Sequence, residues 1–343
     1  MRKLLNTLFV TTPDTYLSLD GENVVIKRED TVLGRYPFHN LEGICTFGYA
    51  GVSPALMGAC AERGIALTFM TRNGRYLASI VGETKGNVIL RKEQYRISDH
   101  PYKSALIASN MICGKLYNSR WILERATRDH ELRIDVVAFK QAAGVISELM
   151  HAARKCTDLE QLRGLEGNAA VQYFSVFDNM ILAQKEHFKF QGRSRRPPLD
   201  NVNALLSFVY TLLAHDAKAA LEMVGLDPYV GFLHRDRPGR ASLALDLMEE
   251  LRGIMVDRFV LSLINKRIVT GSGFYRKESG AVLMDEETRK KVIVAWQERK
   301  QDKIQHPYLG EKISWGLVPY AQALLLARYI RGDLDEYPSF MWK

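Results

Sequence analysis

Over the first eighty or so residues, hydrophobic positions fall in short runs that are separated by turn-forming dipeptides. Apolar residues flank Asp20-Gly21 on both sides, and a second pair of apolar runs flanks Asn73-Gly74. Such dipeptides favour the tight turns that join antiparallel strands, so each pattern predicts a β-hairpin. Between the two hairpins, residues 53–63 fit a short helix that begins with a proline. The N-terminal part is therefore predicted to be rich in β-strands.

Beyond residue 86, the spacing of hydrophobic positions changes to the period of helices. The predicted helices cover residues 103–128, 157–187, 203–224, 242–266, 286–303 and 317–330. Gly225 and Pro228 follow one of these segments closely, as expected after a helix end. The change of period predicts a domain boundary at 82–86. We therefore expect an α+β protein, with a small, sandwich-like β-rich domain at 1–85 and a large all-α domain at 86–343.

The composition of the 343 residues is that of an ordinary globular enzyme, with 47% hydrophobic and 25% charged residues. No window approaches the ~18 apolar residues that a membrane span needs. The four cysteines lie far apart without a C-x-x-C pair, which indicates buried thiols in a reducing compartment. We therefore expect a cytoplasmic protein.

The charge balance favours a polyanionic partner. The chain has 47 Lys and Arg against 39 Asp and Glu, a net charge of +8 and a pI near 9.2. Clustered cations bind phosphates and release counterions, although many basic proteins bind no nucleic acid. The sequence has no G-x-S-x-G elbow, P-loop or G-x-G-x-x-G fingerprint, which argues against serine-nucleophile and nucleotide-driven chemistry.

Residues 231–240 join a histidine to a cluster of arginines just before a predicted helix. His234 ends an apolar stretch, and Arg235, Arg237 and Arg240 follow it. Near phosphate, these guanidinium groups would hold the non-bridging oxygens in bidentate fashion. The alternative is a solvated basic turn with His234 packed in the core, and this segment alone favours that alternative.

In the predicted helix 242–266, acidic residues gather on the flank opposite the apolar face. On a helical wheel this flank holds Asp246, Glu249, Glu250, Gly253 and Asp257. Such a stripe is usually the solvated side of a helix. Carboxylates crowded into a half-buried groove would instead repel one another, and a divalent cation relieves that repulsion. Gly253 would also allow a neighbouring segment to approach closely.

Glu166 stands between two glycines, Gly164 and Gly167, in a helical pattern. Each glycine costs roughly 1 kcal/mol relative to alanine. This cost is tolerated where a backbone or a ligand comes close, and tight helix packing explains it equally well. Two carboxylates and an imidazole from Glu166, His234 and Glu249 would suit a hard cation, but their spacing forms no local metal motif.

A second arginine-rich stretch holds Arg193, Arg195 and Arg196 and leads through a Pro-Pro pair into a predicted helix. It would serve as an arm that lies along a DNA backbone. A basic surface loop explains the same residues equally well.

Taken together, these segments resemble the CRISPR-associated integrase family that captures new spacers. The resemblance covers essentially the whole chain and looks closest to the versions found with type I CRISPR systems. It is carried, in order, by TYLSLDG (15–21), GLEG (164–167), RRPPLDNVNALLSF (195–208), GLDP (225–228), GFLH (231–234) and DLMEELR (246–252).

The resemblance implies an N-terminal β domain that mediates dimerisation and a helical catalytic domain. It maps the family's metal ligands onto Glu166, His234 and Glu249, for Mg²⁺ or Mn²⁺. Asp246 matches a second acidic position of the family, which would orient the site or support DNA binding.

The implied activity is transesterification, in which the 3′-hydroxyl of a captured DNA fragment attacks a phosphodiester at the end of a CRISPR repeat. With water as the nucleophile, the same site would act as an endonuclease. The resemblance also implies a complex of two homodimers bridged by a dimer of a small ferredoxin-like acquisition protein. A non-catalytic DNA-binding scaffold of the same fold and a structure-specific DNA repair nuclease remain the alternatives.

Overall fold

The computed structural model describes residues 7–41, 43–48, 50–71, 76–80 and 88–343. Contacts between residues divide the chain into two compact units, one of residues 1–85 with 289–301 and one of residues 86–288 with 302–343. The boundary expected at 82–86 lies outside the described residues. The segment 289–301, which the sequence assigns to the second domain, groups with the first unit.

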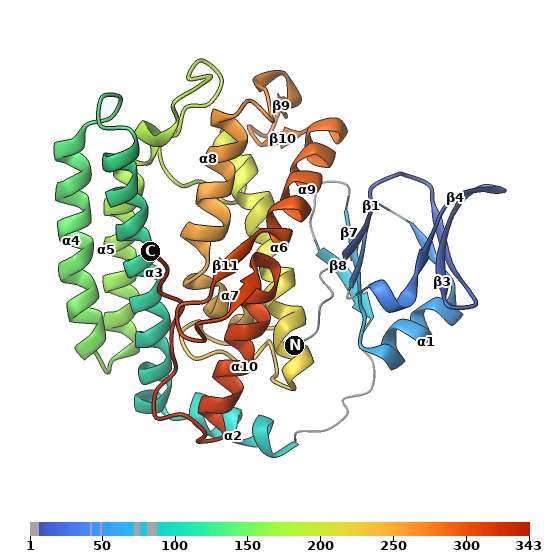
Figure 1. Cartoon of the computed structure of the whole chain (residues 1–343), viewed down its shortest axis with the longest axis horizontal. Coiled ribbons are helices and arrows are strands. Elements are labelled where there is room, and N and C mark those ends of the chain that lie inside the picture. Colours follow the sequence, from blue (N-terminus) through green and yellow to red (C-terminus); the bar gives the residue numbers. More distant parts are fainter. Residues whose placement is uncertain (1–6, 42, 49, 72–75, 81–87) are drawn as a thin grey trace. The chain divides into compact units, whose positions relative to one another are not determined.

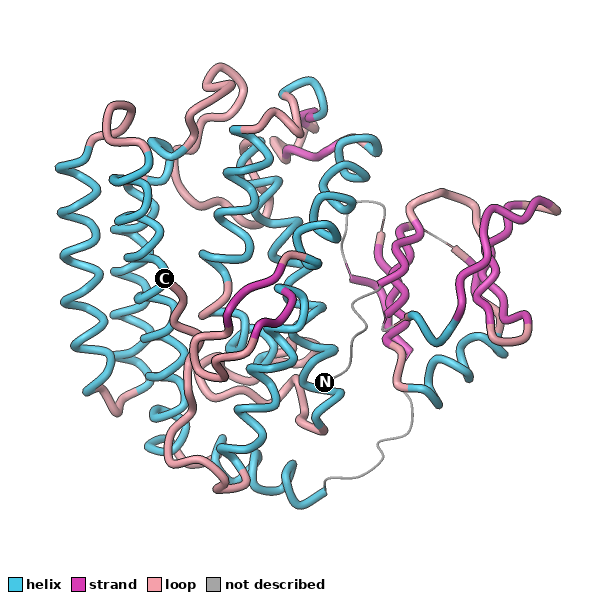
Figure 2. Tube along the Cα trace, in the orientation of Figure 1, coloured by secondary structure: helices cyan, strands magenta, loops and turns pink. Residues whose placement is uncertain are grey.

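Among its described residues, the first unit contains two four-stranded sheets. One has the order β1 (Thr7–Val10), β5 (Gly43–Phe47), β7 (Ala66–Met70) and β8 (Tyr76–Ile80). The other has the order β4 (Thr31–Pro37), β3 (Asn23–Arg28), β2 (Tyr16–Asp20) and β6 (Gly51–Val52). Figure 2 shows these strands in magenta.

Both predicted hairpins pair as antiparallel strands. β2 pairs with β3 in the register Leu17 to Ile26, and Gly21 takes the positive φ of +57° that the tight turn requires. β7 pairs with β8, while the Asn73-Gly74 turn between them lies outside the described residues. The predicted short helix is α1 (Pro54–Arg63), whose first turn is capped by the Ser53 side chain.

Both sheets and α1 contribute to one hydrophobic core in the first unit. Leu17 and Val24 from one sheet, Leu67 from the other and Leu56 from α1 are fully buried in it. All four cysteines are free and buried, as the sequence predicts, and burial raises the pKa of Cys60 to about 12.

The second unit is mainly helical. Its helices are α2 (Val88–Ser98), α3 (Pro101–Asp129), α4 (Val136–Lys155), α5 (Leu159–Ser175), α6 (Asn201–Val224), α7 (Ser242–Glu249), α8 (Arg258–Asn265) and α10 (Val318–Ile330). Helix α9 (Glu286–Gln301) lies mostly in the first unit. The second unit also carries two short antiparallel ribbons, β9 (Phe274–Arg276) with β10 (Val282–Met284) and β11 (Lys303–Gln305) with β12 (Lys312–Ser314). The α+β class is confirmed, with these ribbons added to the helical part.

Helices α3, α4 and α5 are joined by short connections and pack against one another (Figure 1). Asp135 and Asp158 cap the N-termini of α4 and α5 by accepting backbone N–H groups at 3.0 Å and 2.7 Å. Neither α2 nor α4 is among the helices predicted from the sequence. The helix predicted over 157–187 ends at Ser175 instead.

The helix predicted over 242–266 is interrupted by a wider turn. After α7, residues Arg252–Asp257 form a π-helical segment, and α8 follows it directly. Gly253 in this segment lies against α3, where an added Cβ would stand 2.8 Å from Ile122 Cδ1. The close approach predicted at Gly253 is therefore present.

Helix α6 is, among the described residues, long and apolar enough to cross a membrane by length and composition. However, 61% of the most apolar window of α6 is buried inside the protein, and the helix packs against α7 and α10. This burial is typical of a core helix.

Candidate active site

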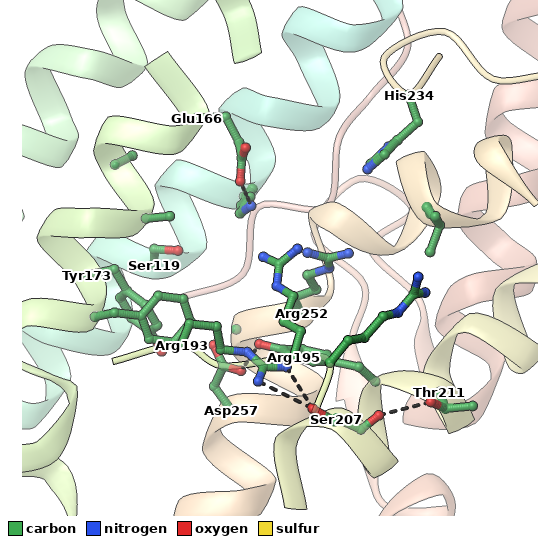
Figure 3. A pocket seen from close by; sticks show the side chains of 18 of the residues that line it. Ser119, Glu166, Tyr173, Arg193, Arg195, Ser207, Thr211, His234, Arg252 and Asp257 are labelled. Atoms are coloured by element: carbon green, nitrogen blue, oxygen red, sulfur yellow. Dashed lines mark hydrogen bonds and ion pairs between the residues drawn. The ribbon is translucent and has the colours of Figure 1, made fainter. Parts of the chain in front are cut away.

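The second unit contains a cavity of about 800 Å³ that brings together most of the residues singled out in the sequence (Figure 3). Seven of its lining residues are Lys or Arg and two are Glu or Asp. The cationic residues are Lys115, Arg193, Arg195, Arg196, Arg237, Arg240 and Arg252, and the acidic ones are Glu166 and Asp257. We call this space the basic cavity, and its charge suits a polyanionic ligand.

Glu166 reaches the basic cavity from α5, and its side chain is 27% exposed. An added Cβ at Gly164 or Gly167 would meet no atom within 4 Å. Tight helix packing therefore does not explain these two glycines. Glu166 forms an ion pair with Lys115 of α3.

His234 lies in the loop between α6 and α7, and the buried carboxylate of Asp246 fixes its position. Asp246 Oδ1 accepts from the backbone N–H of His234 at 3.0 Å and lies 2.6 Å from its Nδ1. Asp246 Oδ2 accepts from the backbone N–H groups of Phe232 and Leu233 at 2.6 and 2.9 Å. An ionised Asp246 keeps the proton on Nδ1, so Nε2 of His234 is left as a lone-pair donor.

Glu249 ends α7 and is almost completely buried, with a side-chain exposure of 3%. Its Oε1 lies 3.1 Å from an Arg252 guanidinium nitrogen and 4.0 Å from His234 Nε2, and its Oε2 lies 2.7 Å from Lys115 Nζ. Burial favours the neutral acid, but Arg252 and Lys115 outweigh it and hold the pKa of Glu249 below its usual range. Glu249 is therefore an ionised carboxylate in a buried position.

Within the described ranges, no three His, Cys, Asp or Glu side chains stand ready to hold a metal ion together. The ammonium group of Lys115 pairs with both Glu166 and Glu249. The donor set still fits a hard cation, because two carboxylates and the Nε2 of His234 face the same region. Glu249 Oε2 is buried, and the Lys115 ammonium group 2.7 Å away compensates its charge.

The arginines proposed as DNA contacts divide into two groups. Arg193, Arg195, Arg196, Arg237 and Arg240 line the basic cavity. Arg235 is not among the lining residues, and its exposed side chain forms an ion pair with Glu160 on α5.

Tyr210 and Arg252 line the basic cavity but were not proposed as site residues from the sequence, and they form a cluster with Arg193 and Asp257. The Tyr210 ring lies between two guanidinium groups, those of Arg193 at 5.2 Å and Arg252 at 5.3 Å from its centroid. Its hydroxyl donates to the buried Asp257. Burial raises the pKa of Asp257 to about 6, although Tyr210 and other neighbours oppose the shift. These contacts hold Arg193 and Arg252 in place beside the carboxylates.

The acidic flank predicted for 242–266 is buried, so its interpretation as a solvated helix side is wrong. The Glu250 side chain lies among residues near the C-terminus, whereas the Glu249 side chain faces Lys115 and His234. Its carboxylate accepts hydrogen bonds from Gln322 Nε2 at 2.9 Å, from the Phe340 backbone N–H at 2.7 Å and from the Tyr337 hydroxyl. Glu250 therefore fixes the C-terminal segment to α7 and takes no part in the basic cavity.

Some residues of the basic cavity were not proposed as site residues from the sequence. Of these, only Asp257 could have been found from the sequence, through its place on the acidic flank. Lys115 lies 51 residues before Glu166, in a helix that packs against α4 and α5. Nothing in the local pattern of α3 distinguishes Lys115 from a surface lysine. Its two partners become visible only when the three helices are assembled.

The family model described as "CRISPR associated protein Cas1" matches residues 8–298. A CRISPR-associated endonuclease Cas1 of Chlorobaculum tepidum is 51% identical over 343 residues and is covered in full, as is this chain. A second, from Rhodospirillum rubrum, is 51% identical over 347 residues, again with both chains fully covered.

Solved structures share the fold at lower identity. A Cas1 protein from Thermotoga maritima superposes with a TM-score of 0.81 at 21% identity, covering 95% of this chain and 97% of the other. A casposase bound to its integration product gives a TM-score of 0.83 at 22% identity, covering 98% and 94%. The family match and the full-length relatives settle the assignment: the chain belongs to the Cas1 family of CRISPR-associated proteins.

Proposed function

We propose that the chain is a divalent-cation-dependent DNA endonuclease and integrase that inserts captured DNA fragments into a CRISPR array. One observation carries the proposal. His234 is held by the buried Asp246, so that its Nε2 faces the ionised Glu249 at the edge of a cavity lined by arginines. The full-length relatives that are named endonucleases support the same activity.

The proposed ligands are Glu166, His234 and Glu249, and the proposed cation is Mg²⁺ or Mn²⁺. When bound, the cation polarises the scissile phosphodiester and stabilises charge on the attacking and leaving oxygens. Asp246 serves as the positioning residue for His234 and is not itself a ligand, because its two oxygens already accept from His234, Phe232 and Leu233.

In the joining step, the free 3′-hydroxyl of the captured fragment attacks a phosphorus atom at a repeat end. A new P–O bond forms to the fragment as its 3′-hydroxyl gives up its proton. The bond from phosphorus to the old 3′-oxygen breaks, and that oxygen takes up a proton and leaves as a hydroxyl. With water as the nucleophile, the same displacement gives hydrolysis. Arg193, Arg237 and Arg240 balance the phosphate charge in the basic cavity, and Arg195 and Arg196 extend this contact along the DNA backbone.

The proposed partners follow from the same activity. We expect the chain to bind the captured fragment and the CRISPR leader-repeat DNA in the cytoplasm. We also expect residues 1–85 to form a homodimer, and two such dimers to assemble around a dimer of a small ferredoxin-like acquisition protein.

A strand-joining assay tests the proposal. A labelled fragment with a free 3′-hydroxyl is incubated with a supercoiled plasmid that carries a leader and repeat, with Mg²⁺ or Mn²⁺. Joining should require the cation and should be abolished in Glu166→Ala and His234→Ala. The matched control is Arg331→Ala, which removes an exposed cation that pairs with Asp333 outside the basic cavity.

The rival functions give different outcomes in this assay. Wild-type rates of joining in Glu166→Ala or His234→Ala would sink the ligand assignment. Cleavage of branched DNA without any need for a repeat would identify a repair nuclease. Tight DNA binding with neither joining nor cleavage under any cation would identify a scaffold.

A further inference from the structure

The ammonium group of Lys115 lies where the two carboxylates of the site meet. Lys115 comes from α3, Glu166 from α5 and Glu249 from the end of α7. Lys115 Nζ pairs with an oxygen of Glu166 and lies 2.7 Å from Glu249 Oε2. One ammonium group therefore bridges two carboxylates from different helices.

The position of Lys115 is incompatible with a cation that binds Glu166 and Glu249 together. Such a cation would bind the same two carboxylates, and its two positive charges would repel an ammonium group at contact distance. The Lys115 side chain is only 14% exposed, so solvent screens this repulsion weakly. Either Lys115 or the cation can hold both carboxylates at one time.

Of the two positively charged side chains that pair with Glu249, Lys115 is the one that can move away from the carboxylates. Arg252 also pairs with Glu249, but the Tyr210 ring lies against its guanidinium group at 5.3 Å. Figure 3 shows Arg252 directed into the same space as Glu166 and His234. Lys115 instead has a flexible four-carbon stem and borders the open basic cavity.

We infer that Lys115 is a built-in competitor of the divalent cation, and that a DNA phosphate in the basic cavity draws it away from Glu166 and Glu249. This inference rests on the proposed function. A phosphate oxygen gives the displaced ammonium group a new partner, so DNA lowers the free-energy cost of loading the cation. By linkage, the cation must raise the affinity for DNA by the same factor. The site is thus held in a weakly loaded state until DNA is bound.

The test measures Mn²⁺ binding directly, so its readout does not depend on turnover. Free Mn²⁺ is titrated by electron paramagnetic resonance against the full chain, with and without a DNA duplex whose 3′-ends are dideoxy-terminated. The variants are Lys115→Met, which keeps the stem without the charge, and Lys115→Arg, which keeps the charge. Lys140→Met, on the exposed face of α4, is the matched control.

Lys115→Met should bind Mn²⁺ about tenfold tighter than wild type without DNA, a difference of about 1.4 kcal/mol. DNA should then raise the Mn²⁺ affinity of Lys115→Met by a smaller factor than that of wild type. Lys115→Arg and Lys140→Met should keep the weak, DNA-dependent binding of wild type. Mn²⁺ should also raise the melting temperature of Lys115→Met by more than it raises that of wild type. Because each shift is measured against the same protein without Mn²⁺, this comparison still holds if Lys115→Met is less stable than wild type.

Equal or weaker Mn²⁺ binding by Lys115→Met would overturn the role of Lys115. If that binding is still lost in Glu166→Gln, the proposed metal site stands and only the competition fails. Absence of Mn²⁺ binding in wild type and Lys115→Met alike would overturn both the competition and the proposed metal site.

Discussion

Asp246 holds His234 through both its backbone and its side chain: one carboxylate oxygen lies 2.6 Å from Nδ1 and also accepts the His234 backbone N–H at 3.0 Å. The other oxygen accepts two further backbone N–H groups from the same loop. An added Cβ at Gly231 would stand 2.8 Å from this second oxygen, so glycine is needed there for the carboxylate to approach. A single buried acid thus sets the shape of the loop and the direction of the imidazole.

Asp246→Asn is expected to weaken Mn²⁺ binding by about 10- to 100-fold. The amide group places N–H donors against backbone N–H groups and no longer fixes the proton on Nδ1. Isothermal titration with Mn²⁺, with the fold checked by circular dichroism, measures the effect. The control is Glu250→Gln, a buried carboxylate in the next helical turn that faces the C-terminal segment, and it should leave Mn²⁺ affinity unchanged. Unaltered affinity in a folded Asp246→Asn would contradict the positioning role.

Asp257 is expected to make the protein less stable as the pH rises from about 4 to about 6. Burial raises its pKa from an ordinary value of 3.8 to about 6 in the folded state, so the folded protein binds this proton more tightly than the unfolded chain. The stabilisation is complete below the unfolded pKa and is lost as the pH rises through the folded pKa. The shift corresponds to about 3 kcal/mol.

Urea unfolding in EDTA at pH 4, 5, 6 and 7 measures this effect. Asp257→Asn keeps the shape without the titration, so the stability of wild type should fall relative to this variant across the range. Parallel pH profiles for the two proteins would disprove the expectation.

Arg237→Ala and Arg240→Ala should each weaken DNA binding by a similar factor for all DNA sequences. Each should also reduce the slope of the logarithm of the binding constant against the logarithm of the salt concentration by about one. The physical reason is the loss of one phosphate contact in the basic cavity. Arg235→Ala should have little effect, because Arg235 pairs with Glu160 and does not line the basic cavity. Fluorescence anisotropy over a range of salt concentrations gives the slopes. A larger loss for Arg235→Ala than for Arg237→Ala would mean that the loop rearranges on DNA.

Two glycine substitutions should act in opposite directions. Gly253→Ala places a Cβ 2.8 Å from Ile122 Cδ1 and should destabilise the protein by about 1–3 kcal/mol. Gly164→Ala adds a methyl group in open space within helix α5 and should stabilise it by up to about 1 kcal/mol. Chemical denaturation of both variants provides the comparison. Equal effects of the same sign would show that the packing at Gly253 is looser than its geometry indicates.

The sequence predicts the elements whose signals are local. The Asp20-Gly21 hairpin and the Ser53 cap of α1 depend on neighbouring residues only, and both are present. Helix α4 was missed because several β-branched residues and Gly144 weaken its local preference. Packing of Phe139 and Ile146 against its neighbours stabilises it instead. The end of α5 at Ser175 and the π-helical segment likewise depend on tertiary contacts.

The candidate site divides in the same way. Residue types singled out Glu166, His234 and the acidic flank, and the family resemblance was needed to choose Glu249 over Glu250. In the structure, Glu249 faces Lys115 and Glu250 faces the C-terminal segment. Lys115 itself was missed because its partners lie on other helices, far along the chain.

The π-helical segment Arg252–Asp257 has a consequence for how this region can change in length. A π-helical turn contains about one residue more than an α-helical turn. Because the wider turn absorbs the extra residue, removing one residue between Arg252 and Asp257 would restore regular helix and leave α8 in nearly the same rotational position relative to α7. Arg252 and Asp257 would still lie one turn apart on the same side, so the contacts of Arg252 with Glu249 and of Asp257 with Tyr210 would be kept. A deletion within α7 would instead turn everything beyond it by about 100°. The π-helical segment can therefore lose one residue at a smaller cost than the regular helix before it.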